Sequence, residues 1–324
     1  MTTEADRFIK KGDAYLGEGM FDKAIKAFTK AIAADPRRPG AYCRRAEAYF
    51  ALAQALVGKE PCGTARLAEF LGKMRARKEL DLSLKDLSTA VELSPDLAEG
   101  YFGQGAIHYE RGRYKEAVAA FTKALPLQEK KAETYFRRAV AYERLNDDAQ
   151  ALKDLDACLR EDPTYADAYL EKGVIYSSQE RYEEARREID KAIALNPRDA
   201  RYYSQRAMAM CMPAFKSGDE GALWEALVYM DQAIKLEPKN AETYFDRGLI
   251  YRVLGESELE LADFSTTITL DPEHASAYRQ RFECFVDSDQ ENEAVRDWIQ
   301  YCARAKKAVR FSKPQKEKSM YSVN

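Results

Sequence analysis

Prolines recur at a fixed distance in this chain, and this period constrains the fold more than any other feature. Pro163 and Pro197 are 34 residues apart, Pro238 and Pro272 are also 34 apart, and Pro95 precedes Pro163 by twice that number. A period of this length indicates a repeat protein in which each repeat is one small structural unit. We therefore expect neighbouring repeats to stack into a single elongated domain.

Each period carries two runs of helical spacing, and the stretch 166–199 shows them most clearly. Its first run has an aromatic residue, then a basic and a small residue, then a second aromatic residue: Tyr169, Lys172, Gly173 and Tyr176. Its second run is small, bulky and small: Ala185, Ile189 and Ala192. The pattern predicts a hairpin of two helices that cross closely at the small residue. One hairpin cannot bury both apolar faces, so it needs neighbours.

These residues resemble the tetratricopeptide repeat, whose pattern has an aromatic, Leu-Gly, an aromatic, Ala, Phe, Ala and Pro at these spacings. The resemblance implies an all-α fold, a right-handed α-solenoid of about eight helical hairpins over residues 1–311. The copies are placed at about 5–38, 39–97, 98–131, 132–165, 166–199, 200–240, 241–274 and 275–308. Three residues depart from the pattern: Glu129 replaces a proline, Glu260 a small residue and Phe282 a Gly or Ala. We expect the eighth copy to pack differently because of Phe282.

Two intervals exceed the period, and each indicates an insertion within a repeat. The interval from Pro36 to Pro95 is 59 residues, which is 25 more than one period. The residues within this insertion keep helical spacing on both sides of a turn at 59–63, so they predict an overlong hairpin. The interval from Pro197 to Pro238 is 41, which is seven more than one period. There we expect Pro213, Gly218 and Gly221 to break the helix and Trp224 to restart it. The last helix should end near Phe311, leaving a basic tail at 312–324 that we expect to be disordered.

Composition excludes several classes of protein. Lys plus Arg number 51 against 54 for Asp plus Glu, so the net charge is −3. This balance does not suit a protein whose main surface binds nucleic acid or an anionic membrane. No apolar run approaches the roughly 20 residues of a membrane span, and residues 1–11 are polar. Six scattered cysteines without a CxxC pair suit free thiols in a reducing compartment, with a redox or disulfide role as the alternative. The expected location is the cytoplasm.

The sequence offers little material for catalysis, so we expect no enzyme, no cofactor and no metal. His108 occupies an aromatic position of its repeat, which favours packing, and His274 precedes a helix, which favours capping. No known catalytic motif stands in a suitable context. Met208, Met210, Cys211 and Met212 lie within five residues and could bind copper(I), although methionine more commonly fills an irregular core.

A second apolar stripe follows the first helices, beside the residues that close each hairpin. By resemblance it lines the inner groove of the solenoid, where tetratricopeptide proteins hold an extended or helical peptide; the alternative is packing against the next repeat. The candidate groove residues are Phe102, Tyr109, Phe136, Arg137, Val140, Arg144, Leu170, Glu171, Val174, Met208, Phe245, Asp246 and Leu249. Mixed charge beside an apolar floor suits a protein segment better than nucleic acid.

The predicted function is a non-catalytic scaffold that binds a peptide or helix of another protein, whose identity the sequence does not give. The family's clamp for the acidic chain ends of heat-shock chaperones is absent, because its places hold Ile9, Asp13, Arg44, Glu99 and Gly103. The family's asparagine ladder is also missing, since Arg137, Glu171, Gln205 and Asp246 take its places. One alternative is self-assembly into a homo-oligomer through the long hairpin around Leu67, Phe70, Leu71 and Met74. A weaker alternative is recruitment of RNA or anionic membrane by the basic tail.

Overall fold

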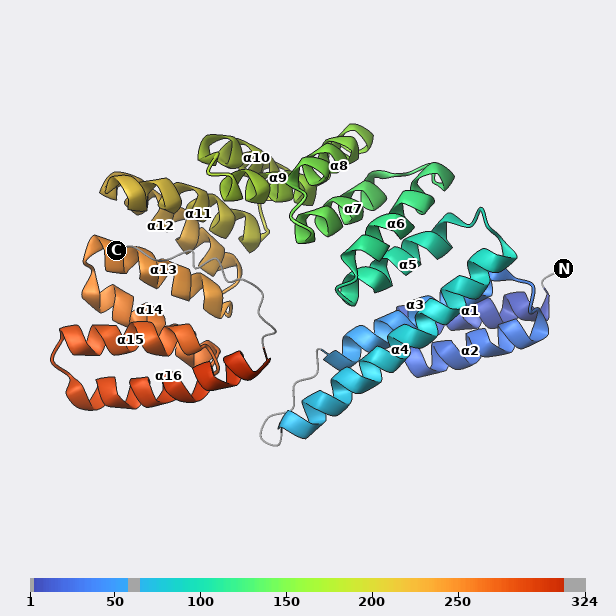
Figure 1. The fold of residues 1–324 in the computed structure, drawn as a ribbon, viewed down its shortest axis with the longest axis horizontal. Helices are drawn as coiled ribbons and strands as arrows, with labels where there is room; N and C mark the ends of the chain where they lie inside the picture. Colours follow the sequence, from blue (N-terminus) through green and yellow to red (C-terminus); the bar gives the residue numbers. More distant parts are fainter. Residues whose placement is uncertain (1–2, 58–64, 312–324) are drawn as a thin grey trace. The chain divides into compact units, whose positions relative to one another are not determined.

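A computed structural model describes residues 3–57 and 65–311, and the side chains of these residues except 57, 65–73 and 306–311. Within this part of the chain the regular structure is helical, with no strand (Figure 1). The helices are α1 (Glu4–Gly17), α2 (Phe21–Ala34), α3 (Pro39–Val57), α4 (Ala65–Leu93), α5 (Ala98–Glu110), α6 (Tyr114–Ala124), η1 (Leu125–Leu127), α7 (Ala132–Arg144), α8 (Asp148–Glu161), α9 (Ala166–Ser178), α10 (Tyr182–Leu195), α11 (Ala200–Ser217), α12 (Glu220–Leu236), α13 (Ala241–Leu254), α14 (Ser257–Leu270), α15 (Ala275–Asp287) and α16 (Glu291–Phe311).

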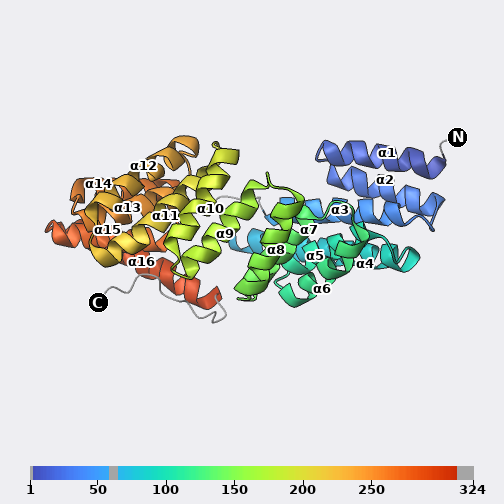
Figure 2. The ribbon, with the colours of Figure 1, turned by 90° about the horizontal axis from the view of Figure 1, so that it is seen from above.

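The chain forms two compact units, Met1–Glu171 and Lys172–Asn324. In unit 1, α1 and α2, α3 and α4, α5 and α6, and α7 and α8 pair as hairpins, and each first helix also contacts the first helix of the next hairpin. In unit 2, α11 to α16 form three further hairpins of the same kind, with α10 packed on α11 (Figure 2). The all-α class and the solenoid of helical hairpins are confirmed.

The small residue of the first helix is required because a large side chain of the second helix lies directly against it. A Cβ atom added at Gly105 would lie 2.6 Å from Phe121 Cδ1, and one added at Gly248 would lie 2.8 Å from Phe264 Cε1. Phe282 stands at the same place in the last hairpin, and its ring lies 5.2 Å from that of Trp298. The last hairpin therefore closes by aromatic packing where the others close on a glycine or alanine.

A ladder of arginines, which the sequence analysis did not interpret, ties the hairpins together. Arg138 donates to Asp154, 16 residues later on its own hairpin, at 2.6 Å, and to Thr122, 16 residues earlier on the preceding hairpin, at 2.9 Å. Arg45, Arg247 and Arg281 bond in both directions in the same way. Each arginine thus joins two adjacent hairpins, and the carboxylate within its own hairpin is buried.

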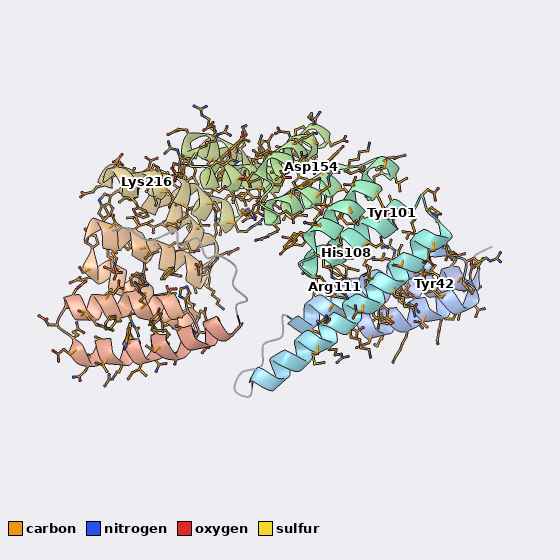
Figure 3. The ribbon with its side chains drawn as sticks, viewed as in Figure 1. Tyr42, Tyr101, His108, Arg111, Asp154 and Lys216 are labelled. Atoms are coloured by element: carbon orange, nitrogen blue, oxygen red, sulfur yellow. The ribbon has the colours of Figure 1, made fainter. Side chains whose placement is uncertain are left out.

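The ladder also locates the large insertion. Arg45 donates to Asp86, which lies 41 residues later, whereas the equivalent spacing elsewhere is 16. The 25 additional residues therefore lie between these two positions, and they lengthen both helices: α3 has 19 residues and α4 has 29. The long α4 reaches the end of α5, where Arg111 pairs with Asp81 and His108 lies half-buried (Figure 3). The predicted turn at 59–63 falls outside the described residues.

The smaller insertion does not break the helices where the sequence analysis expected. α11 runs through Pro213 and ends at Ser217, before Gly218, whose φ of 73° ends the helix as predicted. α12 begins at Glu220, so Gly221 and Trp224 lie within it. The predictions for Pro213, Gly221 and Trp224 were wrong. The seven residues lengthen two helices instead of forming a loop, and Asp219 caps α12 by accepting a hydrogen bond from the backbone NH of Ala222 at 3.1 Å.

The sulfur-rich segment lies in the core of unit 2. Met210 and Cys211 are buried in one cluster with Leu223 and Met230, and burial raises the pKa of the Cys211 thiol to about 12. A thiol held in its neutral form is a poor metal ligand. The structure therefore supports core filling over the copper(I) alternative. Among the described cysteines Cys43, Cys158, Cys211, Cys284 and Cys302 are free thiols.

Candidate peptide-binding surface

A hollow on the first-helix surface of unit 1 lies between α3 and α5. It is a pocket of about 320 Å³ with an apolar floor and a charged rim, lined by Cys43, Arg44, Ala46, Glu47, Phe50, Ser83, Leu87, Glu99, Phe102, Gly103, Ala106, Ile107 and Gln128. Phe102, a predicted groove residue, forms part of the floor, and its ring lies 5.7 Å from that of Phe121. Gly103 packs closely against another lining residue, since a Cβ there would lie 3.0 Å from Leu87 Cδ1.

The rim of this pocket carries more negative than positive charge. Arg44 is about half exposed and lies 2.9 Å from Glu47 and 3.6 Å from Asp13, and Glu99 lines the opposite side. Hydrogen bonding to Glu47 raises the pKa of the Arg44 guanidinium, so this group stays charged. Three carboxylates around a single arginine disfavour an acidic ligand. An apolar side chain flanked by a cationic or neutral group fits this arrangement better.

On α7 the predicted groove residues make contacts that fix them in place. Arg137 pairs with Glu133 at 2.6 Å, and Tyr165 donates its hydroxyl proton to the same carboxylate. Phe136 stacks on Tyr165 with a ring separation of 5.0 Å and is half-buried. Arg137 is more than half exposed, so it can still reach a ligand.

Arg144 extends this surface from the end of α7 back to α5. Its guanidinium donates to Tyr109 Oη at 3.2 Å and is about half exposed. Val140, one turn before it, is half-buried. The structure therefore brings Tyr109, Val140 and Arg144 onto neighbouring helices, because α5 and α7 are in contact.

Leu170 and Phe245 are less available than the sequence suggested. Leu170 is 5% exposed and Phe245 is 8% exposed. The Phe245 ring lies 5.7 Å from Phe264 on its own second helix and 4.6 Å from His274, which precedes the next first helix. For Phe245, packing between repeats, the alternative interpretation, describes the contacts. Leu170 is likewise buried. Glu171 belongs to unit 1, and Val174 belongs to unit 2 and is half-buried.

In unit 2 the half-buried candidates are Met208, Asp246 and Leu249, on α11 and α13. Burial, with a contribution from Glu242, raises the pKa of the Asp246 carboxyl to about 7. Beside it His274 Nε2 lies 3.1 Å from Glu242 Oε2, and this contact raises the pKa of the imidazole. His274 Nδ1 accepts from the backbone NH of Ala277 at 3.0 Å, which confirms its predicted capping role.

Several pocket residues were not among the predicted site residues. Phe50 and Leu87 lie on the two lengthened helices, where the insertion hides the repeat register. Gln128 follows η1, in the repeat that lacks its proline. The one available signal was Gly103, which stands where two neighbouring repeats carry Arg44 and Arg137. A glycine in place of an arginine allows a neighbouring helix to approach closely, and Leu87 of α4 does so here.

The described residues contain no group of three or more His, Cys, Asp or Glu side chains that could hold a metal ion. No helix in the described ranges combines the length and apolarity that a membrane crossing needs. The first-helix surface of unit 1 combines an apolar pocket floor with paired charged side chains.

Two models of the tetratricopeptide repeat match the chain, one over residues 147–210 and the other over 12–52 and 105–146. The chain is a tetratricopeptide-repeat protein. The matched ranges omit residues 53–104, which contain the large insertion. Tetratricopeptide-repeat proteins are in general non-catalytic scaffolds for protein interactions.

Relatives of this tetratricopeptide-repeat protein include human DnaJ homolog subfamily C member 7, which is 24% identical over 353 residues, covering 91% of this chain and 66% of that protein. Mouse RNA polymerase II-associated protein 3 is 34% identical over 96 residues, covering 27% of this chain and 14% of that protein. The chain thus spans only a part of these relatives.

Two solved structures share the fold. A tetratricopeptide-repeat protein from Parabacteroides merdae is 17% identical, covers 87% of this chain and 98% of its own, and has a TM-score of 0.58. Pseudomonas aeruginosa pilF is 19% identical, with 72% and 92% coverage and a TM-score of 0.55. At these identities the likeness concerns the fold alone.

Proposed function

We propose that this protein is a non-catalytic cytoplasmic scaffold that binds a peptide or helix of another protein on the first-helix surface of unit 1. The pocket between α3 and α5 supports this proposal most directly, because it combines an apolar floor of Phe50 and Phe102 with the charged rim around Arg44. Binding hot spots typically consist of one bulky side chain inserted into such a pocket and surrounded by polar contacts. Arg137 and Arg144 would contact the segment beyond the pocket.

The same rim argues against acidic chain ends as ligands. Asp13, Glu47 and Glu99 surround Arg44, so an incoming carboxylate would meet repulsion from three groups and attraction from one. Relatives named as organizing proteins for Hsp70 and Hsp90, such as Hsp70-Hsp90 organizing protein 2 of Arabidopsis thaliana, match this chain over 36% of its length. We expect the partner segment of this protein to differ from acidic chaperone tails.

Filling the pocket tests the proposal. Ala106 lines the pocket and is half-buried, so Ala106→Trp should occupy it while the helix persists. A displayed library of random peptides is selected on the wild-type protein, and the Kd of the selected peptides is then measured on both proteins. We expect a loss of affinity of at least about tenfold in the variant, since one buried anchor contributes about 2 kcal/mol or more.

Ala119→Trp is the matched control, because Ala119 is exposed on the second helix α6 and should not alter binding. Circular dichroism should report equal helix content for all three proteins. Peptides that bind the wild type and Ala106→Trp equally well would contradict the pocket as the binding site. Selected peptides rich in acidic residues would contradict the rim argument separately.

A further inference from the structure

Three junctions between hairpins in the described chain are closed by the same kind of contact. The residue just before a first helix bonds to an acidic residue 32 positions earlier, near the start of the previous first helix. The pairs are Arg38 with Asp6, Tyr165 with Glu133, and His274 with Glu242. Each contact ties the entrance of one hairpin to the hairpin before it, so the junctions differ mainly in the side chain that donates.

The three donors respond differently to pH. An arginine stays charged throughout the physiological range, so Arg38 always donates as a cation. Burial raises the pKa of the Tyr165 hydroxyl above its ordinary value, so this donor stays neutral. A histidine ordinarily changes its charge between about pH 5 and 8. The junction at His274 is therefore the one of the three whose charge can change near neutral pH.

The neutral imidazole of His274 serves two partners at once. Its Nδ1 accepts from the backbone NH of Ala277 at 3.0 Å and caps α15, so the ring proton lies on Nε2. Nε2 then donates to Glu242 Oε2 at 3.1 Å. The His274 side chain is 13% exposed, and its ring centroid lies 4.6 Å from that of Phe245, a contact that keeps the ring in this place.

A second proton can bind only at Nδ1, the atom that caps α15. An imidazolium has two NH donors and no acceptor, in either orientation of the ring. It cannot accept the NH of Ala277, so the charged ring loses the cap. It keeps its bond to Glu242, and that bond becomes a stronger, charge-assisted one. Protonation thus removes one contact of the ring and strengthens the other.

The charges around this turn favour the imidazolium. They are Glu242 and Asp246 on α13, Asp271 and Glu273 in the turn before α15, and Arg304 on α16. The cation among them, Arg304, is itself held by the carbonyl oxygen of Pro272 at 2.6 Å and by Glu273. Hydrogen bonding to Glu242 raises the pKa of the imidazole, and the same bond lowers the pKa of the Glu242 carboxyl. The ion pair therefore stabilises the folded protein in mild acid, and this contribution is lost as the pH rises through the pKa of His274.

We propose that His274 is a proton-operated switch at the junction between the last two hairpins. As a neutral ring it caps α15, and as an imidazolium it pairs with Glu242 and releases the first turn of α15. The hairpins stay connected in both states, and what changes is the order at the start of α15. The switch does not depend on the peptide binding proposed for unit 1.

Nuclear magnetic resonance of the imidazoles tests the protonation directly, because the chain has two histidines and His274→Tyr assigns their signals. We expect His274 to be the Nε2–H tautomer at about pH 8 and an imidazolium at about pH 5. Glu242→Gln should lower the pKa of His274, because it removes the facing carboxylate. A ring that is still neutral at pH 5, an Nδ1–H tautomer at pH 8, or a pKa unchanged by Glu242→Gln would overturn the proposal.

Hydrogen exchange of the full chain, measured by mass spectrometry, tests the release of α15. His274→Asn is the matched control, since asparagine also caps helices and does not titrate. We expect the two proteins to exchange equally at the start of α15 at about pH 8, and the wild type to exchange about threefold or more faster at about pH 5. Each comparison is made at one pH, so the effect of pH on the intrinsic exchange rate cancels.

His274→Tyr is the second control, because it copies Tyr165: it keeps a donor for Glu242 but has no acceptor at the place of Nδ1. The start of α15 in the wild type should exchange about threefold or more slowly than in this variant at about pH 8, and equally at about pH 5. Ratios to both controls that do not change with pH would overturn the switch.

Two further outcomes decide whether the effect belongs to His274. The starts of α3 and α9, which follow Arg38 and Tyr165, should show no such change, and an equal change there would overturn a local switch. Asp246 titrates in the same pH range, so the comparisons are repeated with Asp246→Asn in every protein. We expect the effect to persist, and its disappearance would overturn the assignment to His274.

Discussion

At the scale of single residues, the ladder arginines show how a charged side chain replaces an apolar one in a repeat core. The position that holds Leu in the family pattern holds Arg247 here, and its guanidinium lies 2.7 Å from Asp263, whose side chain is 6% exposed. Arg247 also packs beside Tyr244 and Tyr251, at 5.6 and 5.7 Å from the ring centroids. Removing one partner of a buried ion pair is strongly destabilising, because it leaves the other charge buried and unpaired. Replacing both partners by apolar side chains need not destabilise the protein.

We therefore predict opposite outcomes for single and double replacement of this pair. Arg247→Leu should lower the free energy of unfolding by about 3–5 kcal/mol, because Asp263 is left buried without its partner. Arg247→Leu combined with Asp263→Leu should recover most of that loss. Urea unfolding of the two single variants and the double variant gives the coupling free energy. Additive effects, with no recovery in the double variant, would contradict the paired role.

The raised pKa of Asp246 predicts how the stability of the folded protein depends on pH. Its pKa is raised to about 7 in the folded protein, from an ordinary value of 3.8, mainly through burial. Between these two values the unfolded chain releases the proton while the folded protein keeps it, so the contribution of Asp246 to stability falls as pH rises from about 4 to 7. Asp246→Asn cannot ionise and should lose this dependence.

We expect the advantage of Asp246→Asn over the wild type to grow by about 1 kcal/mol or more between pH 5 and pH 8. Urea unfolding at the two pH values measures it. Comparing the two proteins at each pH removes the part of the titration of His274 and Glu242 that does not depend on Asp246. A difference that does not change with pH would show that Asp246 ionises normally.

At the scale of elements, the insertions lengthen helices instead of adding loops, and one of them places a proline inside a helix. Pro213 lies within α11, where its missing NH leaves one carbonyl without its helical partner. Pro39, in contrast, is the first residue of α3, a position that proline favours.

We predict that Pro213→Ala raises the free energy of unfolding by about 1–3 kcal/mol, since it restores the helical hydrogen bond. Pro39→Ala should leave it unchanged or slightly lower. Thermal and urea unfolding of the two variants under identical conditions provide the comparison. Equal effects from both prolines would mean that the surroundings of Pro213 already compensate for its lost hydrogen bond.

At the scale of the whole molecule, stability should be distributed hairpin by hairpin, because the main contacts between the described helices join each hairpin to its neighbours. Gly105→Ala places a Cβ 2.6 Å from Phe121 Cδ1 and should destabilise its own hairpin by about 1–3 kcal/mol. Gly40→Ala has open space around it and serves as the control.

Hydrogen exchange measured by mass spectrometry should locate the effect of Gly105→Ala. Protection should fall in α5, α6 and the hairpins next to them, and should stay unchanged in α13 to α16. The Gly40→Ala profile should match that of the wild type. Faster exchange throughout the chain would contradict the expectation that stability is local.

The sequence alone determined the helical hairpins and their period, because the 34-residue register repeats local rules of helix spacing and close packing. It also located both insertions, and the 41-residue spacing from Arg45 to Asp86 agrees with the larger one. It could not determine how the added residues fold: Pro213 stayed inside a helix because the surrounding packing outweighs its local cost.

Only the tertiary structure separated available side chains from buried ones. Phe102 and Phe245 occupy equivalent positions in their repeats, yet Phe102 lines an open pocket while Phe245 is covered by Phe264 and His274. The pocket beside Phe102 includes Phe50 and Leu87 of the lengthened α3 and α4, which come together with α5 only in the fold. Exposure on α16 was hidden for the same reason, since helical spacing gives a face but not what covers it.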